Sequence, residues 1–332
     1  MADQATILLA FTLFMALAYA YSNGLNDAAN ALATVVSTRA MTPVAAVIMG
    51  GAMNLLGALT GTAVAKTIGK GIVDPDYMTQ AAVLSAILAA VAWVITATRF
   101  GLPVSVSHSL VAGVLGAGIS TAGLEQVNET VMTKVLMALA FSPFLGFLGA
   151  FVFMVLLYWL LRHGTLSTVN AIFIKLQILS AALLSYSHGK NDAQNAIGIM
   201  ALGWAVYYSN DVTVEVWMQI TAGVAIGIGT ALGGWRVIRT LGSRITRLEP
   251  TNGFIANIAA ATVIEAASNI GLPVSTTHTA SSAIMGVGAT RGLSAISLNV
   301  IRGIFAAWLV TYPVCLGLAF VFVKIFQIIL SS

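Results

Sequence analysis

Two short polar clusters interrupt an otherwise apolar chain, and their side chains could bind a cation and an anion together. The first cluster covers 22–31 and the second, 165 residues later, covers 187–196. Each contains one acidic residue, Asp27 or Asp192, between Asn side chains. A carboxylate within an apolar segment is costly, and such residues usually serve function. Two matched copies therefore predict one binding site built from two sides of the molecule.

The amide side chains of these clusters are expected to share a helix face with the neighbouring Asp. Asn26 and Asn30 are four residues apart, as are Asn191 and Asn195, and this spacing places each pair on one side of an α-helix. The carboxylates would supply negative charge for a cation, and the amides would orient oxygens or donate to an oxyanion. A structural polar cluster between helices is the alternative interpretation.

Each cluster includes a glycine within an apolar block that is longer than one membrane crossing needs. The blocks cover 5–38 and 171–208, whereas about 20 residues suffice to cross a bilayer. We therefore predict a helix break near Gly24 and another near Gly189. Such breaks would free backbone carbonyls at membrane depth, where they can hold ions.

A second repeated motif could supply an anion site. Gly-Leu-Pro-Val-Ser occurs at 101–105 and again at 271–275. Pro103 and Pro273 are expected in the first turn of a helix, which leaves backbone N–H groups free just beyond them. Two such helix N-termini facing each other would enclose a small tetrahedral oxyanion, whereas plain helix capping is the alternative. The hydroxyl-bearing residues here are Ser105, Ser107, Ser109, Ser275, Thr276, Thr277 and Thr279.

Five further polar side chains have roles that the sequence leaves open. His108 and His278 could carry protons or donate to an anion, or they could pack. Lys190 could pair with the second Asp or attract anions, or its chain could extend to the membrane interface. Glu265 could face the site or make a helix–helix contact. Asn54 is expected in a packing face.

The composition indicates the class of protein. Of 332 residues, 58% are hydrophobic and 8% are charged, whereas soluble domains carry about 25% charged residues. We predict an all-α integral membrane protein. Cys315 is the only cysteine, which excludes an internal disulfide and a cysteine-based metal cluster. The sequence contains no P-loop or hydrolase motif, so we expect no enzyme activity.

Five apolar blocks are followed by five more, which indicates an internal duplication. Both motifs recur at matched offsets, as does the pair Pro143 and Pro313. We predict two repeats, 1–165 and 166–332, of about five helical segments each, with broken helices and helical hairpins meeting at a midplane site. The blocks are 5–38, 43–65, 78–99, 104–121, 131–161, 171–208, 216–235, 251–270, 276–290 and 295–330.

The distribution of basic residues predicts that the repeats are inverted in the membrane. With the N-terminus outside and a hairpin formed by the third and fourth blocks of each half, basic residues concentrate inside, as the positive-inside rule requires. We therefore predict a multi-pass protein of the inner (plasma) membrane with both termini outside. The inside set is Arg39, Arg99 (if its hairpin spans), Arg162, Lys175, Arg236, Arg239, Arg244, Arg247, Arg291 and Arg302, and the outside set is Lys66, Lys70 and Lys134.

The motifs together resemble the inorganic phosphate transporter (Pit) family. The segments GLNDAAN at 24–30 and GKNDAQN at 189–195 resemble its twin signature, and 229–236 with 273–279 resemble bacterial members in particular. The resemblance covers essentially the whole chain. It implies cation-coupled phosphate uptake, two inverted repeats, outside termini and a homodimer. Many members have Glu where Asn54 stands, and the long cytoplasmic insertion of animal members is missing here.

The resulting hypothesis is a secondary symporter that imports inorganic phosphate with Na+ or H+ by alternating access. No cofactor beyond the coupling ion and no nucleic-acid partner is expected, and Na+ is expected at the two Asp residues. The resemblance implies phosphate contacts from Asn26, Asn30, Asn191, Asn195, Ser105, Ser107, Ser275, Thr276 and Thr277. It implies cation contacts from Asp27, Asp192, Asn26, Asn191, Ser105 and Ser275.

Three alternatives accompany this hypothesis. A sulfate permease on the same scaffold is the nearest, because nothing local in the sequence distinguishes the two oxyanions. An intramembrane aspartyl protease would use the two Asp residues as a catalytic dyad. A passive anion channel would conduct without any cation gradient.

Overall fold

The structure, a computed structural model, describes residues 4–163 and 165–331 as helices joined by short loops. Three 3₁₀ helices, η1 (Pro75–Tyr77), η2 (Leu124–Gln126) and η4 (Leu293–Ala295), and one π-helix, η3 (Thr240–Arg244), accompany the α-helices. The α-helices are α1 (Gln4–Ser37), α2 (Pro43–Ala58), α3 (Ala63–Lys70), α4 (Gln80–Phe100), α5 (Val106–Ala122), α6 (Glu129–Leu160), α7 (Leu166–Tyr208), α8 (Val216–Leu232), α9 (Trp235–Arg239), α10 (Pro250–Asn269), α11 (Thr276–Ala289) and α12 (Leu298–Ser331).

The length and composition of the helices confirm a multi-pass membrane protein. In the described part of the chain, α1, α4, α6, α7 and α12 are each long and apolar enough to cross a bilayer. Two further apolar segments are helix pairs bent at a short break: α2 and α3 meet at 71°, and α8 meets the α9–η3 segment at 59°. Broken helices are therefore present, as predicted.

The two halves of the chain pack through matching contacts. α1 lies against α4 and α8, while α7 lies against α10 and α2. α6 packs on α11 and α12 packs on α5, so each long final helix covers the other half's hairpin. The Thr67 hydroxyl donates to the carbonyl of Gly271 at 2.7 Å, and the Thr240 hydroxyl donates to the carbonyl of Gly101 at 3.1 Å. This reciprocity is what a duplicated chain with an approximate two-fold relation produces.

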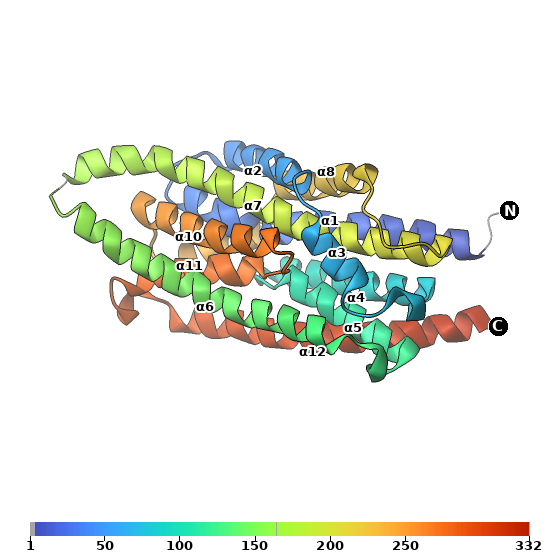
Figure 1. Cartoon of the computed structure of the whole chain (residues 1–332). Coiled ribbons are helices and arrows are strands. Elements are labelled where there is room, and N and C mark those ends of the chain that lie inside the picture. Colours follow the sequence, from blue (N-terminus) through green and yellow to red (C-terminus); the bar gives the residue numbers. More distant parts are fainter. Residues whose placement is uncertain (1–3, 164, 332) are drawn as a thin grey trace.

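The directions of the helices match inverted repeats. In Figure 1, α1 and α7 run in opposite directions along the elongated molecule, and so do α6 and α12. α1 begins and α12 ends at the same end of the molecule, and α6 ends and α7 begins at the other. The α4–α5 hairpin occupies the first of these ends and the α10–α11 hairpin the second.

The predicted helix breaks at Gly24 and Gly189 are wrong, because α1 and α7 continue through both positions. The glycines allow close helix crossings instead. A Cβ at Gly24 would collide with the backbone carbonyl of Ile226 in α8, and one at Gly189 would collide with that of Asn54 in α2. Without a side chain, two backbones can approach closely, as is common between helices in lipid. The breaks occur in α2–α3 and α8–α9, the helices that cross α7 and α1.

Candidate functional site

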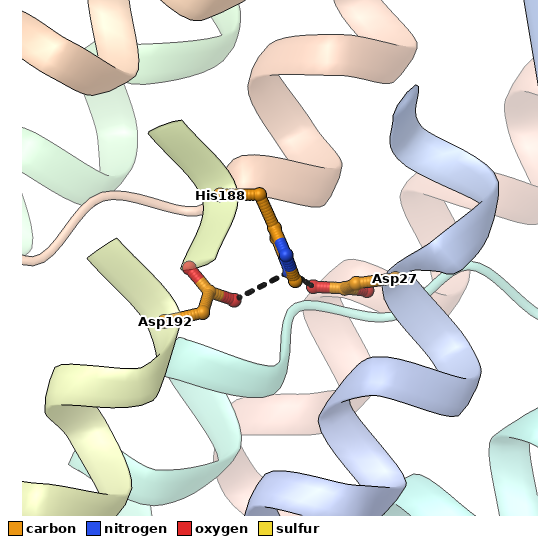
Figure 2. Close-up of side chains that lie close together, drawn as sticks. All are labelled: Asp27, His188 and Asp192. Atoms are coloured by element: carbon orange, nitrogen blue, oxygen red, sulfur yellow. Dashed lines mark ion pairs between the residues drawn. The ribbon is translucent and has the colours of Figure 1, made fainter. Parts of the chain in front are cut away.

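Asp27 of α1 and Asp192 of α7 meet in the interior of the molecule. Their residues are 2% and 0% exposed. The Nε2 atom of His188 lies 3.5 Å from the Asp27 carboxylate and 3.4 Å from that of Asp192, and Figure 2 shows the imidazole between the two. The hydroxyl of Thr276 lies 3.1 Å from an oxygen of each carboxylate. The prediction that the two acidic residues come together is thus met in the geometry.

Each carboxylate has further donors of its own. Asp192 accepts hydrogen bonds from the amides of Asn23 at 3.0 Å and Asn191 at 2.7 Å. Asp27 accepts one from the hydroxyl of Thr277 at 2.7 Å. Charge-assisted hydrogen bonds of this kind stabilise the ionised carboxylates. Since helices of both repeats contribute donors, any movement between the halves would change the site.

The orientation of His188 is set by Asn54 in α2. The Asn54 amide donates to the Thr230 hydroxyl at 2.7 Å, and that hydroxyl donates to the carbonyl of Gly24. This places the Asn54 amide oxygen 2.8 Å from Nδ1 of His188. Nδ1 must then carry a proton, because an amide oxygen only accepts. The Nε2 atom, which faces both carboxylates, either carries a second proton or presents a lone pair.

The carboxylates and His188 Nε2 form a group that could hold a cation. One ligand atom from each of Asp27, His188 and Asp192 lies within 4.8 Å of the others. Nearby buried amide oxygens have no hydrogen-bond partner in the described part of the chain, among them those of Asn23, Asn30 and Asn195. Asn23 and Asn30 flank Asp27 at helical spacing on its own face. Buried acceptors without a donor are costly, so a bound cation near these oxygens would stabilise the arrangement.

The turns of the two hairpins meet beside this cluster. The Ser107 hydroxyl donates to the carbonyl of Val274 at 3.3 Å and accepts from the amide of Asn195 at 3.0 Å. The amide of Asn30 donates to Thr277 at 3.2 Å. Among the described residues, the backbone N–H groups of Ser107 and Thr277 find no acceptor. Free N–H groups and hydroxyls at two helix N-termini are the anion-binding features that the sequence predicted.

The prolines of these turns lie outside the helices, so the prediction that they occupy the first turn is wrong. α5 begins at Val106 and α11 at Thr276, each three residues after its proline. Ser105 and Ser275 have an extended backbone and act as N-caps that accept from the N–H groups of His108 and His278 at 3.1 Å. Capping, the alternative interpretation, is therefore present for Ser105 and Ser275.

Two predicted amides hold the hairpins. Asn26 donates to the Thr98 hydroxyl at 2.9 Å and to the carbonyl of Leu102 at 3.2 Å. None of its hydrogen bonds in the described chain reaches an Asp carboxylate. Asn191 combines both roles, because its amide nitrogen donates to the carbonyl of Val274 as well as to Asp192.

The remaining open side chains lie as follows. His108 and His278 pack against each other with ring centroids 4.6 Å apart, and Trp308 stacks on His278 at 3.8 Å. Lys190 does not pair with Asp192, because it forms an ion pair with Glu265 of α10 and donates to Asn269 at 2.7 Å. Glu265 therefore makes a helix–helix contact.

Sequence reasoning missed three residues of the cluster. Asn23 and His188 stand at equivalent places of the duplicated segment, four residues before their Asp. A polar residue at that place in both copies was the available signal, because it predicts the same helix face. Asn54 was assigned to packing, and no second copy marked it.

Comparison with known proteins identifies the family. A model of the phosphate transporter family matches residues 23–169 and again 161–319. This chain belongs to the phosphate transporter family. The two matches, one in each half, agree with the duplicated fold, and the resemblance inferred from the two motifs is confirmed. Asp27 lies in the first matched segment and Asp192 in the second, so each match contributes one carboxylate to the cluster.

Named relatives and one solved structure are similar over nearly the full length. A probable low-affinity inorganic phosphate transporter of Bacillus subtilis is 39% identical over 94% of this chain and 95% of its own. One of Rhizobium meliloti is 40% identical over 90% of each chain. A solved structure described as "The sodium-dependent phosphate transporter" has a TM-score of 0.90 at 27% identity, covering 97% of this chain and 100% of its own. These family members are transporters rather than enzymes.

Proposed function

We propose that this member of the phosphate transporter family is a secondary symporter that imports inorganic phosphate together with Na+. The observation that carries the proposal is the meeting of two buried carboxylates, one from each half, at the N-terminus of α11. Na+ is a hard cation that prefers oxygen ligands, as Ca²⁺ and Mg²⁺ do. Carboxylate, hydroxyl and unpartnered amide oxygens are all present here. The similar solved structure is described as sodium-dependent, which also favours Na+ over H+.

Charge explains why phosphate would need the cation. Asp27 and Asp192 place two negative charges in a region where their residues are almost wholly buried. Adding an anionic phosphate beside them would cost Coulomb energy that a low-dielectric interior amplifies. Cations bound at the carboxylates offset this repulsion. Phosphate binding and Na+ binding thereby become coupled, because each ligand lowers the free-energy cost of binding the other.

Phosphate would bind at the two hairpin turns. The free N–H groups of Ser107 and Thr277 and the amides of Asn30 and Asn195 supply donors from both repeats. Thr276 touches both carboxylates and would connect the cation and the anion positions. His108 and His278 lie in the first turns of α5 and α11, each three residues after its N-cap serine. We assign them a packing role.

Transport would follow from movement of one set of elements against the other around this site. The proposed repeats are 1–165 and 166–332, inverted in the membrane, as in other transporters with a midplane site between repeats. The positive-inside rule places the two terminal ends outside and the α6–α7 link inside. The inner membrane as location and a homodimer as assembly belong to the same proposal.

Uptake of radiolabelled phosphate into proteoliposomes tests the function. We expect accumulation under an imposed Na+ gradient and none under a pH gradient alone. Asp27→Asn and Asp192→Asn should each abolish it, whereas Asp211→Asn, which removes a carboxylate at the protein surface, should not. Excess sulfate should leave uptake unchanged. Accumulation driven by the pH gradient alone, or phosphate flux in the complete absence of Na+, would contradict Na+ symport.

A further inference from the structure

A basic cavity lies at the far end of α1 from the N-terminus. It has a volume of about 780 Å³ and is lined by the end of α1, the turn between α4 and α5, and the α9–η3 segment. Three arginines line it, Arg236, Arg239 and Arg244, and no acidic residue does. Among the described residues, none of the three forms an ion pair with a carboxylate. The cavity therefore concentrates positive charge without an internal counter-charge.

The residues that line this cavity are of the types found at the membrane–water interface. Trp235 lines it and is 45% exposed, and tryptophan is enriched at the membrane interface. Ser37 and Ser243 also line it, and their hydroxyls donate to the carbonyls of Thr34 and Arg239 in the adjoining helical turns. By the positive-inside rule this end is the cytoplasmic one, where the leaflet carries anionic lipids.

The same cavity contacts the turn of the first hairpin. Arg236 donates to the backbone carbonyl of Arg99, and Thr240 donates to that of Gly101. A ligand in the cavity would therefore touch both the α9–η3 segment and the turn that precedes Ser105. The corresponding segment of the other half, α3, carries Lys66 and Lys70, and Lys70 is paired with Asp211 at 3.4 Å. The unpaired basic cavity thus belongs to one end of the molecule.

We propose that this cavity is a second anion site, which binds a phosphate group and is separate from the site between the repeats. Arginine is suited to this ligand, because its planar guanidinium presents paired donors that match two phosphate oxygens. The phosphate group can belong to an anionic phospholipid or to free inorganic phosphate. Because Phe100 and Gly101 line the cavity together with residues of the α9–η3 segment, the bound group holds the first hairpin to that segment.

Two binding measurements distinguish these sources. The protein in uncharged detergent is offered phosphatidylglycerol or phosphatidylcholine, and bound lipid is counted by native mass spectrometry. In a second arm without added lipid, radiolabelled inorganic phosphate is titrated by equilibrium dialysis. We compare the wild type with the variant Arg236→Gln/Arg239→Gln/Arg244→Gln. The control variant Lys175→Gln/Arg247→Gln/Arg302→Gln removes the same charge from exposed positions outside the cavity.

If a lipid occupies the cavity, the cavity variant loses affinity for phosphatidylglycerol, by about fivefold for each arginine removed. The control variant then retains its affinity for this lipid. If free phosphate occupies the cavity, the cavity variant binds one phosphate per chain fewer than the wild type, and the control variant binds as many as the wild type. A cavity variant that matches the wild type in both arms overturns the proposal, and so does an equal loss in the control variant. The single substitution Arg239→Gln gives the same comparison with less change to folding.

Discussion

Asn54 of α2 accepts a hydrogen bond from Nδ1 of His188 in α7, at 2.8 Å. This contact determines which imidazole nitrogen faces Asp27 and Asp192, because Nδ1 is already engaged. It also connects α2, the first helix of a bent pair, to the centre of the site. Asn54 is thus a positioning residue that acts through His188.

Asn54→Leu should weaken the coupling to Na+. The imidazole would lose its fixed orientation, and Nδ1–H would be buried without an acceptor, which costs about 1–3 kcal/mol. We expect the apparent KM for Na+ in phosphate uptake to rise by about tenfold. The matched control is Thr262→Val, since Thr262 donates only within its own helix, to Ile258. An unchanged Na+ dependence in Asn54→Leu would show that His188 needs no positioning.

Ser107→Ala should raise the KM for phosphate by about tenfold, because it removes a hydroxyl where the hairpin turns meet and leaves Asn195 without its acceptor. Ser109→Ala is the control: its hydroxyl bonds only to carbonyls of Ser105 and Val106 at the start of its own helix. Initial rates of phosphate uptake at saturating Na+ measure the effect. Equal KM values for the two variants would place phosphate elsewhere.

Gly189→Ala should destabilise the protein, because its Cβ would collide with the backbone of Asn54. Backbone cannot rotate aside as a side chain can, so we expect a loss of about 1–3 kcal/mol. Gly317→Ala is the control, since a Cβ there meets nothing within 4 Å and the position lies in α12. Alanine in a helix is favoured over glycine by up to about 1 kcal/mol. Thermal unfolding in detergent should separate the two variants, and equal midpoints would refute the close crossing.

Removing one partner of the Lys190–Glu265 pair should destabilise the protein more than removing both. Each single substitution, Lys190→Ala or Glu265→Ala, leaves a partly buried charge without its counter-charge, at a cost of about 1–3 kcal/mol after allowing for the exposed part of Glu265. The double variant leaves neither charge. Unfolding midpoints of all four proteins form a double-mutant cycle. Strictly additive losses would mean that the pair contributes no interaction energy.

The class of fold and the centre of the site could be predicted from the sequence because the motifs that indicate them occur in both halves of the chain. A carboxylate in an apolar segment is rare, and its repetition at Asp192 predicted the convergence that Figure 2 shows. The repeated Pro-Val-Ser turns likewise predicted two helix ends near the site. The resemblance then supplied the substrate, which the residue pattern alone left as a small oxyanion.

What the sequence did not specify depends on contacts between distant elements. A glycine in a helical segment is compatible with a helix break or with a close helix crossing. Gly24 lies at a crossing because α8 passes directly beside it. Lys190 lies next to Asn191 and Asp192 in sequence, yet its side chain reaches α10 and pairs with Glu265. Asn54 reaches His188 because α2 crosses α7. Such partners follow from packing, which a local pattern does not encode.

The most direct test of the account is phosphate-dependent binding of radiolabelled Na+ to the purified protein, compared between wild type, Asp27→Asn and Asp192→Asn. Because the two carboxylates share Thr276 and His188, we predict that either substitution alone abolishes the Na+ binding that phosphate promotes. Full phosphate-dependent Na+ binding in either variant would contradict a single site built by both halves.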